Sequence, residues 1–158
     1  MLVMGQAEGP GCFCSLNDLL RYGIESLSRD FDVVLVDCEA GIEQVNRRVI
    51  HAIDKLFLIT DPNKRGIEAA SRVRDIASKY NVKKTLKSYL IVNRIRNSED
   101  RGPLQETAEG LGMNILGYIP EDGGIRNFNL NGKPLIDLPD DSPSVTACRD
   151  ILRDFKWA

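Results

Sequence analysis

The sequence predicts an α/β protein built on a doubly wound, mostly parallel β-sheet with helices on both faces. Its apolar residues are continuous in short runs rather than alternating, which is typical of strands buried on both faces. Helical patterns separate the runs, and strands that alternate with helices form βαβ units. The 158 residues show no internal repeat or linker and are expected to form one domain, 1–158. The runs are DVVLVD (32–37), KLFLIT (55–60), KSYLIVN (87–93) and ILGYIP (115–120), with LVMG at 2–5 as a candidate fifth.

Apolar residues at helical spacing indicate the first two helices. They recur between Leu16 and Leu27, and Ser15 with Asp18 would form a capping box where this helix begins. A second stripe follows the run at 55–60. Its members are Ile67, Ala70, Val73, Ile76, Ala77 and Tyr80.

Turn and capping residues predict two further helices. Pro103 suits the first turn of a short helix that ends near Gly110 to Gly112. Close to the C-terminus, Ser142 is expected to cap a helix whose first residue is Pro143. The apolar face of that helix consists of Val145, Cys148, Ile151, Leu152 and Phe155.

Composition argues against two classes of partner. The formal net charge is −2 and the basic residues are scattered, whereas nucleic-acid binding needs a clustered excess of Lys and Arg. No apolar run approaches the roughly 20 residues of a membrane span. The first residues carry no charged region typical of a signal peptide, so we expect a cytoplasmic protein that binds neither nucleic acid nor membranes.

Polar residues follow each predicted strand, at the edge where doubly wound sheets bind ligands. Polar residues also end strands and begin turns without any role in binding. For any one segment, this structural explanation is an alternative to a ligand site. Four such segments together favour a shared site. They are residues 37–41, 60–63, 93–94 and 120–122.

Two of these segments have side chains suited to a nucleotide. Asp37 at a strand tip could hold a Mg²⁺-bound water, and Gly41 would let a backbone amide approach a terminal phosphate. Asn93 offers a paired donor and acceptor for a base edge, and Arg94 can stack on a ring, although a strand-end turn explains both equally well. The Gly-rich phosphate loop that ends in GK[ST] is absent.

Cys12 and Cys14 precede a predicted helix, whose positive dipole end lowers the pKa of a thiol and favours metal-binding thiolate. Two thiolates supply half of a tetrahedral site. Cys38 and Cys148 are predicted to be core thiols, and His51 a surface or packing residue, so a second copy of the chain is the simplest source of the other ligands. Two ordinary thiols remain an equal alternative.

Five segments together resemble the CooC family, the nickel-insertion ATPases that serve carbon monoxide dehydrogenase, within the MinD/ParA/nitrogenase-iron-protein group of P-loop ATPases. The most specific are the C-x-C before a helix and the signature from Glu39 to Glu43. The resemblance spans nearly the whole chain, through the segments GCFCSLNDLLR, DVVLVDCEAGIEQVNRR, LFLITDPNKRGIEAASRV, YLIVNRI and LGYIPEDGGIRNFNLNGKPL.

The resemblance implies roles for particular residues. Cys12 and Cys14 would bind Ni²⁺ or Zn²⁺ between the two subunits of a homodimer. Asp37 and Gly41 would lie near Mg²⁺ and the phosphates of ATP or ADP. The nucleotide-associated set continues with Asn93 and Arg94 at the adenine, beside the loop Pro120, Glu121 and Asp122, while Glu39, Glu43 and Arg47 would belong to a helix that moves with nucleotide state.

Two departures from the family matter. Gln44 replaces a His that family members often carry. The amino-terminal portion with the phosphate loop is missing, and by the family's topology its strand lies between those equivalent to 32–37 and 55–60. Either these two strands pair directly, or another polypeptide fills the gap, or the sequence is a fragment.

The resemblance therefore implies a CooC-like accessory ATPase for the maturation of carbon monoxide dehydrogenase, its client. The family hydrolyses ATP, but this chain should be inactive alone because it lacks the phosphate loop. A non-catalytic metal-binding dimerisation module, or half of a split ATPase, is the alternative. A MinD/ParA-type ATPase is a weaker one.

Overall fold

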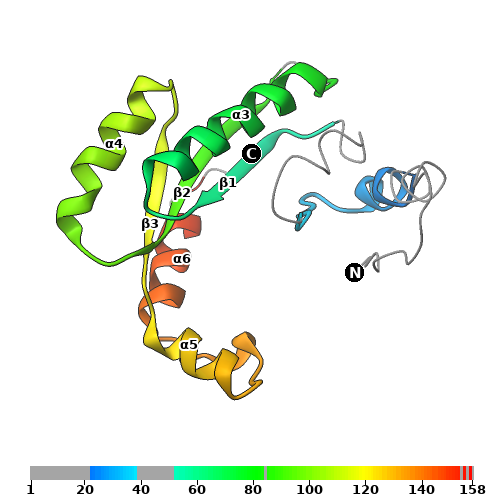
Figure 1. Ribbon diagram of the computed structural model, residues 1–158. Helices are drawn as coiled ribbons and strands as arrows, with labels where there is room; N and C mark the ends of the chain where they lie inside the picture. The colour runs from blue at the N-terminus through cyan, green and yellow to red at the C-terminus, as the bar shows by residue number, and fades with distance from the viewer. Residues whose placement is uncertain (1–21, 39–51, 84, 154, 156, 158) are drawn as a thin grey trace, which may run out of the picture. The chain divides into compact units, whose positions relative to one another are not determined.

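The structure is a computed structural model that describes residues 22–38, 52–83, 85–153, 155 and 157 (Figure 1). The chain divides into two compact units, which are described separately. The first comprises Met1–Asp54 and Asp75–Leu86, and the second Lys55–Arg74 and Lys87–Ala158. The expectation of a single domain stays a prediction.

A parallel three-stranded sheet forms the centre of the second unit (Figure 1). Its strands are β1 (Lys55–Thr60), β2 (Lys87–Ile95) and β3 (Ile115–Pro120), in the order β1-β2-β3. β1 pairs with β2 in continuous register from Lys55 opposite Lys87 to Thr60 opposite Val92. The predicted strands at 55–60, 87–93 and 115–120 are confirmed, and β2 continues two residues further through an irregularity in its pairing with β3.

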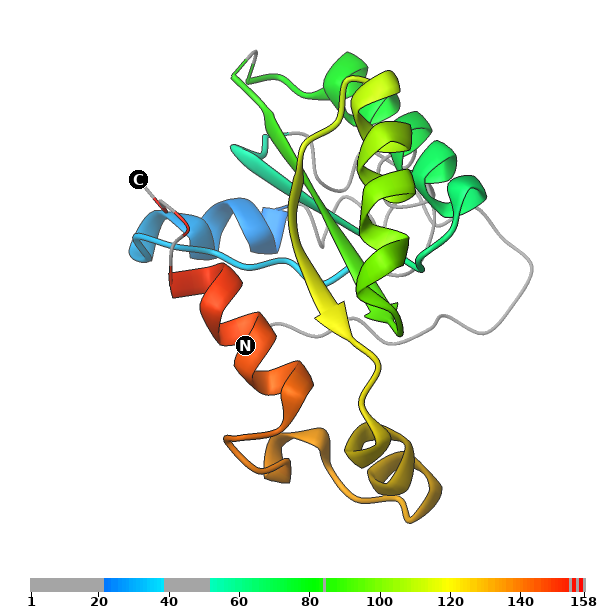
Figure 2. The same ribbon diagram turned by 90° about the vertical axis from the view of Figure 1, so that its left-hand side faces the viewer.

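Helices cover both faces of this sheet, which confirms the predicted α/β class (Figure 2). Helices α3 (Lys64–Tyr80) and α4 (Arg101–Gly110) lie on one face and α6 (Pro143–Arg153) lies on the other, while α5 (Gly123–Leu130) follows β3 beyond the end of the sheet. Short 3₁₀ turns at Ser98–Asp100 and Leu135–Asp137 belong to this unit, and one at Ser28–Asp30 belongs to the first unit. The stripe predicted from Ile67 onward lies on α3, where Ile67, Ala70 and Ala77 are buried, while Tyr80 in the last turn is exposed. α4 begins two residues before the predicted Pro103, because a 3₁₀ turn leads into it.

The main apolar core lies between the sheet and the helices α3 and α4. Leu90 and Val92 of β2 point to this face and meet Ile67 of α3. These three are the largest fully buried side chains among the described residues. Removing each from water contributes about 1.5–3 kcal/mol to folding. Leu104 and Ala108 of α4 complete the contact.

Aromatic rings cover the opposite face, where side chains at odd positions of β1 and β2 point. The rings of Phe57 and Tyr89 are stacked with centroids 5.7 Å apart, and Phe155 lies 4.9 Å from each. Trp157 packs edge-on against Phe155 at 5.0 Å, and its carbonyl accepts a hydrogen bond from Lys55. These contacts fix the end of the chain against the sheet.

α6 packs closely against β3 on the same face. A Cβ atom at Gly117 would lie only 2.5 Å from Cγ1 of Ile151, so only a glycine fits this contact without movement. Val145, Cys148 and Ile151 are half-buried, as the predicted apolar face requires, whereas Leu152 is exposed.

The first unit corrects one prediction. Residues 33–38 form no strand, and Val33 and Leu35 are 53% and 76% exposed, although the apolar run predicts a buried strand. A strand persists only when a neighbour takes up its backbone hydrogen bonds, and within the described part of the chain this run has no such neighbour. Cys38 is consequently exposed, so the prediction of a core thiol there is wrong.

Two other parts of the first unit form local structure. Residues 22–27 are helical, as predicted for the end of the first helix. The Asn81 side chain bridges the backbone of Ile53, accepting its N–H at 3.1 Å and donating to its carbonyl at 2.9 Å. The capping box at Ser15 and Asp18 and the candidate strand at 2–5 lie outside the described residues. No helix within the described ranges is long and apolar enough to cross a membrane.

Candidate functional site

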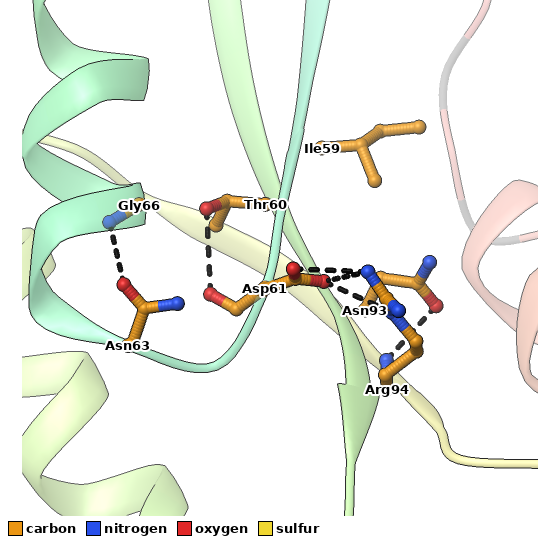
Figure 3. Close-up of a pocket in the computed structure, with 7 residues that line it drawn as sticks. All are labelled: Ile59, Thr60, Asp61, Asn63, Gly66, Asn93 and Arg94. Carbon is orange, nitrogen blue, oxygen red and sulfur yellow. Dashed lines mark hydrogen bonds and ion pairs between the residues drawn. The ribbon is translucent and has the colours of Figure 1, made fainter. Parts of the chain in front are cut away.

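The carboxyl ends of β1 and β2 enclose a hollow of about 370 Å³ in the second unit (Figure 3). Its walls come from the end of β1, the loop into α3 and the end of β2: Ile59, Thr60, Asp61, Asn63, Gly66, Asn93 and Arg94. A second hollow of about 340 Å³ shares Asp61, Asn63 and Arg94 and continues to Arg96 and Glu121. Three of the four polar segments predicted to form a shared site therefore lie along one edge of the sheet.

The loop from β1 to α3 is held tightly against the helix. Asn63 accepts a hydrogen bond from the backbone N–H of Gly66 at 2.8 Å, which satisfies an amide in the first turn of α3. A Cβ atom at Gly66 would lie 2.1 Å from Oγ1 of Thr60. Gly66 thus allows α3 to begin close to the end of β1, and both segments line the hollow.

Asp61 and Arg94 form a two-pronged ion pair between neighbouring strand ends (Figure 3). Nη2 of Arg94 lies 2.7 Å and 2.9 Å from the two carboxylate oxygens, and Nε lies 3.0 Å from Oδ1. Both side chains are about half exposed or more, at 49% for Asp61 and 63% for Arg94. The pair therefore adds at most about 1 kcal/mol to stability, but its planar fork orients the guanidinium.

Arg94 has a left-handed backbone, with φ of 59°. It lies where the pairing of β2 with β3 is irregular, between Val92 opposite Tyr118 and Ile95 opposite Pro120. Its backbone N–H donates to Oδ1 of Asn93 at 2.9 Å. This conformation costs a non-glycine residue about 1–2 kcal/mol, so the surrounding contacts must hold it.

Glu121 forms the equivalent ion pair at the next strand end. The Arg96 guanidinium donates to both of its carboxylate oxygens, with Nη2 3.0 Å from Oε1. The hydrogen bond from Arg96 lowers the pKa of Glu121 below its usual range. Its backbone N–H also donates to the carbonyl of Ile95 at 2.9 Å, which ties the loop after Pro120 to the end of β2.

Both carboxylate oxygens of Asp122 accept hydrogen bonds from other residues of the second unit. Oδ1 accepts the backbone N–H of Gly124 at 2.7 Å, and Oδ2 accepts the hydroxyl of Ser142 and the N–H and hydroxyl of Ser144. The hydroxyls of Ser142 and Ser144 hold the pKa of Asp122 well below its usual range. Ser142 directly precedes Pro143, the first residue of α6, as predicted, but its hydroxyl donates to Asp122, and the carboxylate of Asp122 accepts the N–H of Ser144 in the first turn of α6.

The remaining predicted residues belong to the first unit or to α6, or lie outside the described residues. Asp37 belongs to the first unit and is exposed. Cys148 on α6 is half-buried, and burial raises the pKa of its thiol, as expected of a core cysteine. Within the described ranges, no three His, Cys, Asp or Glu side chains are grouped to hold a metal. Outside these ranges lie Cys12, Cys14, Glu39, Gly41, Glu43, Gln44, Arg47 and His51.

Asp61 and Arg96, which form the ion pairs at this edge, are absent from the predicted nucleotide-associated set. Asp61 directly follows an apolar run, and this signal places it at the edge of the sheet. Nothing in the local sequence indicates that its partner is Arg94. That pairing depends on the register between β1 and β2.

Comparisons with known proteins agree with this fold. The chain is 37% identical over 152 residues to an uncharacterized ATP-binding protein of Methanocaldococcus jannaschii, a match that covers 96% of the chain and 59% of that protein. It is 31% identical over 153 residues to the carbon monoxide dehydrogenase accessory protein CooC of Rhodospirillum rubrum, covering 95% of the chain and 54% of CooC. No family model matches.

Among solved structures, the MinD cell division protein of Aquifex aeolicus superposes with a TM-score of 0.69 at 26% sequence identity. The match covers 87% of the chain and 59% of that protein. The chain thus spans between half and three-fifths of the length of these relatives.

Proposed function

Since this chain belongs to the CooC/MinD/ParA group of proteins, we propose that it supplies the base-binding part of a site for ATP or ADP with Mg²⁺. The observation that carries this proposal is the irregular backbone of Asn93 and Arg94 near the end of β2, where Arg94 is left-handed. This segment, the Asn93–Arg94 turn, lines the hollow at the ends of β1 and β2. A carboxamide can both donate to and accept from the edge of adenine, and a guanidinium plane can lie against a ring. The loop at Pro120, Glu121 and Asp122 would form the far wall.

The described residues fit the base better than the phosphates. The lining of the hollow includes two carboxamides, one carboxylate and one guanidinium, and the guanidinium of Arg94 is already neutralised by Asp61. No GK[ST] loop is present in the sequence to hold a triphosphate. We therefore expect this chain alone to bind nucleotide weakly and not to hydrolyse it, while Asp37 and Gly41 would act near Mg²⁺ and phosphate in the whole protein.

The whole protein would be a cytoplasmic accessory ATPase that delivers nickel to carbon monoxide dehydrogenase. The similarity to CooC along 95% of the chain supports this assignment, as does the C-x-C pair. Cys12 and Cys14 from two subunits would bind Ni²⁺ or Zn²⁺ across a homodimer, and Glu39, Glu43 and Arg47 would move with nucleotide state. Nickel is here the cargo. Nucleic acid and membranes are not partners in this proposal.

Two other functions are alternatives to nickel delivery. A metal-binding dimerisation module, or half of a split ATPase, would keep the C-x-C site without hydrolysis. A MinD-type ATPase is favoured by the similarity to the Aquifex MinD structure, but it has no evident use for the C-x-C pair.

The base-binding proposal is tested by titrating the purified chain with Mg-ADP and Mg-GDP while following its backbone amide resonances. We expect shifts at the ends of β1 and β2 and a preference for ADP. Asn93→Ala should reduce the affinity for ADP and abolish the preference. Asn114→Ala, at an exposed position just before β3, is the matched control and should bind as the wild type does. Equal affinity for the two nucleotides, or unchanged binding in Asn93→Ala, would refute the proposal.

A further inference from the structure

We propose that Asp61 is a positioning residue, which holds the Asn93–Arg94 turn in the conformation that presents the Asn93 amide to a purine base. This inference rests on the proposed function and deepens it. Asp61 itself need not touch the base. Its effect passes through the guanidinium and backbone of Arg94.

The first step is the contact between strand ends. Thr60 lies opposite Val92 in the last pair of the β1–β2 register, so Asp61 is one residue and Arg94 two residues beyond the regular pairing. Three donor–acceptor distances between 2.7 Å and 3.0 Å join the guanidinium to the carboxylate. This geometry leaves the arginine side chain little rotational freedom relative to β1.

The second step is the backbone of Arg94. Its φ of 59° is the only positive value at a non-glycine residue within the described ranges. Such a conformation persists only where neighbouring contacts determine it. Without the carboxylate of Asp61, Arg94 could return to an extended conformation. Because side chains alternate along a strand, straightening this segment would turn the side chains near its end towards the other face.

The third step is the orientation of the Asn93 amide. Its Oδ1 accepts the N–H of Arg94, which fixes the plane of the carboxamide and leaves one lone pair on that oxygen. Its Nδ2 has no hydrogen-bond partner among the described residues, and Figure 3 shows it directed away from Arg94. One donor and one acceptor thus remain side by side. Adenine offers the complementary N6 donor and N7 acceptor, whereas guanine offers two acceptors.

Base selectivity should therefore depend on Asp61. Asp61→Asn keeps the size of the side chain but removes the charge of the ion pair, and Arg94→Gly permits a positive φ without any partner. The double variant Asp61→Asn/Arg94→Gly should consequently regain the turn that Asp61→Asn loses. Asp140→Asn, which breaks the exposed ion pair with Arg149, is the matched control.

Two measurements separate the possibilities. In the nucleotide-free protein, the three-bond coupling between the amide proton and Hα of residue 94 reports its φ. With ligand, the ratio of the dissociation constants for Mg-GDP and Mg-ADP reports base selectivity. We expect Asp61→Asn to change the coupling and to lower this ratio about tenfold, within the range of one bidentate base contact. The double variant should recover most of the ratio, and the control should match the wild type.

The proposal fails if Asp61→Asn leaves both the coupling and the ratio unchanged, or if the double variant regains the positive φ but not the ratio. A wild-type chain that shows no preference for ADP would instead overturn the proposed function. In that case the coupling would still decide whether Asp61 holds the turn.

Discussion

Asp122 and Ser144 are joined by two hydrogen bonds, one from the backbone N–H of Ser144 at 3.1 Å and one from its hydroxyl at 2.7 Å. The other oxygen of the same carboxylate accepts the N–H of Gly124 in the first turn of α5. One side chain therefore caps the amino ends of both α5 and α6. The loop at the end of β3 is held in place by this arrangement, so its position beside the candidate site depends on Asp122.

Replacing Asp122 should destabilise the protein through both helices. Each lost cap costs about 0.5–2 kcal/mol, so the loss of both in Asp122→Ala should lower the free energy of unfolding by about 1–4 kcal/mol in urea titrations. Asp100 is a matched control, because it stands at the N-cap of α4 without a capping hydrogen bond. Asp100→Ala should change the stability by less than about 0.5 kcal/mol. Equal losses in the two variants would show that Asp122 does not cap.

The low pKa of Asp122 predicts a pH dependence of stability. Its pKa in the folded protein is below the unfolded value of about 3.9, so the ionised carboxylate stabilises the fold at neutral pH. This stabilisation is present above the unfolded pKa and is lost as the pH falls below it towards the folded pKa.

Unfolding midpoints in urea, measured between about pH 6 and pH 3, test whether stability falls with pH as the low pKa of Asp122 predicts. The wild-type midpoint should fall across the acid end of this range, and Asp122→Asn should fall less steeply. Some dependence should remain in the variant, because the pKa of Glu121 is also lowered. A variant as steep as the wild type would contradict the assignment to Asp122.

The parallel strands were predictable because their information is local. The runs at 55–60, 87–93 and 115–120 are apolar, short and bounded by turn residues, and all three form strands. The run at 32–37 has the same local character but forms no strand, since a strand also needs a partner that its own residues do not specify. The position of Ser142 before the first residue of α6 was predicted correctly, but the carboxylate that accepts the amide in the first turn comes from Asp122, 20 residues earlier, which the local sequence does not indicate.

The candidate site also combines features that the local sequence predicts with a feature that it does not. Asn93 and Arg94 at the end of β2 were identified from chemistry and position alone. The left-handed backbone of Arg94 was not predicted. Local propensity argues against this conformation, and the carboxylate that pairs with the Arg94 side chain comes from the end of another strand.

Gly117 is predicted to be intolerant of a side chain because of Ile151. A methyl group there would lie 2.5 Å from Cγ1 of that residue, so Gly117→Ala should cost about 1–3 kcal/mol of stability. Ile151→Ala removes the clashing atoms, and the double variant should be more stable than the sum of the two single effects allows. Gly110→Ala, whose new methyl group would meet nothing within 4 Å, is the control and should not destabilise. Additive losses would mean that the cost of Gly117→Ala does not come from the contact with Ile151.

The C-x-C pair predicts metal-dependent association. Two thiolates fill half of a tetrahedral site, so tight binding of Zn²⁺ or Ni²⁺ requires a second chain. Adding either metal to the reduced protein should give one ion per two chains and a shift from monomer to dimer, read together by metal analysis and light scattering. Cys12→Ser/Cys14→Ser should abolish both, whereas Cys148→Ser should abolish neither, because that thiol is half-buried on α6. One ion per monomer, or binding that survives the double substitution, would remove the nickel-delivery proposal and leave the adenine site to be judged by itself.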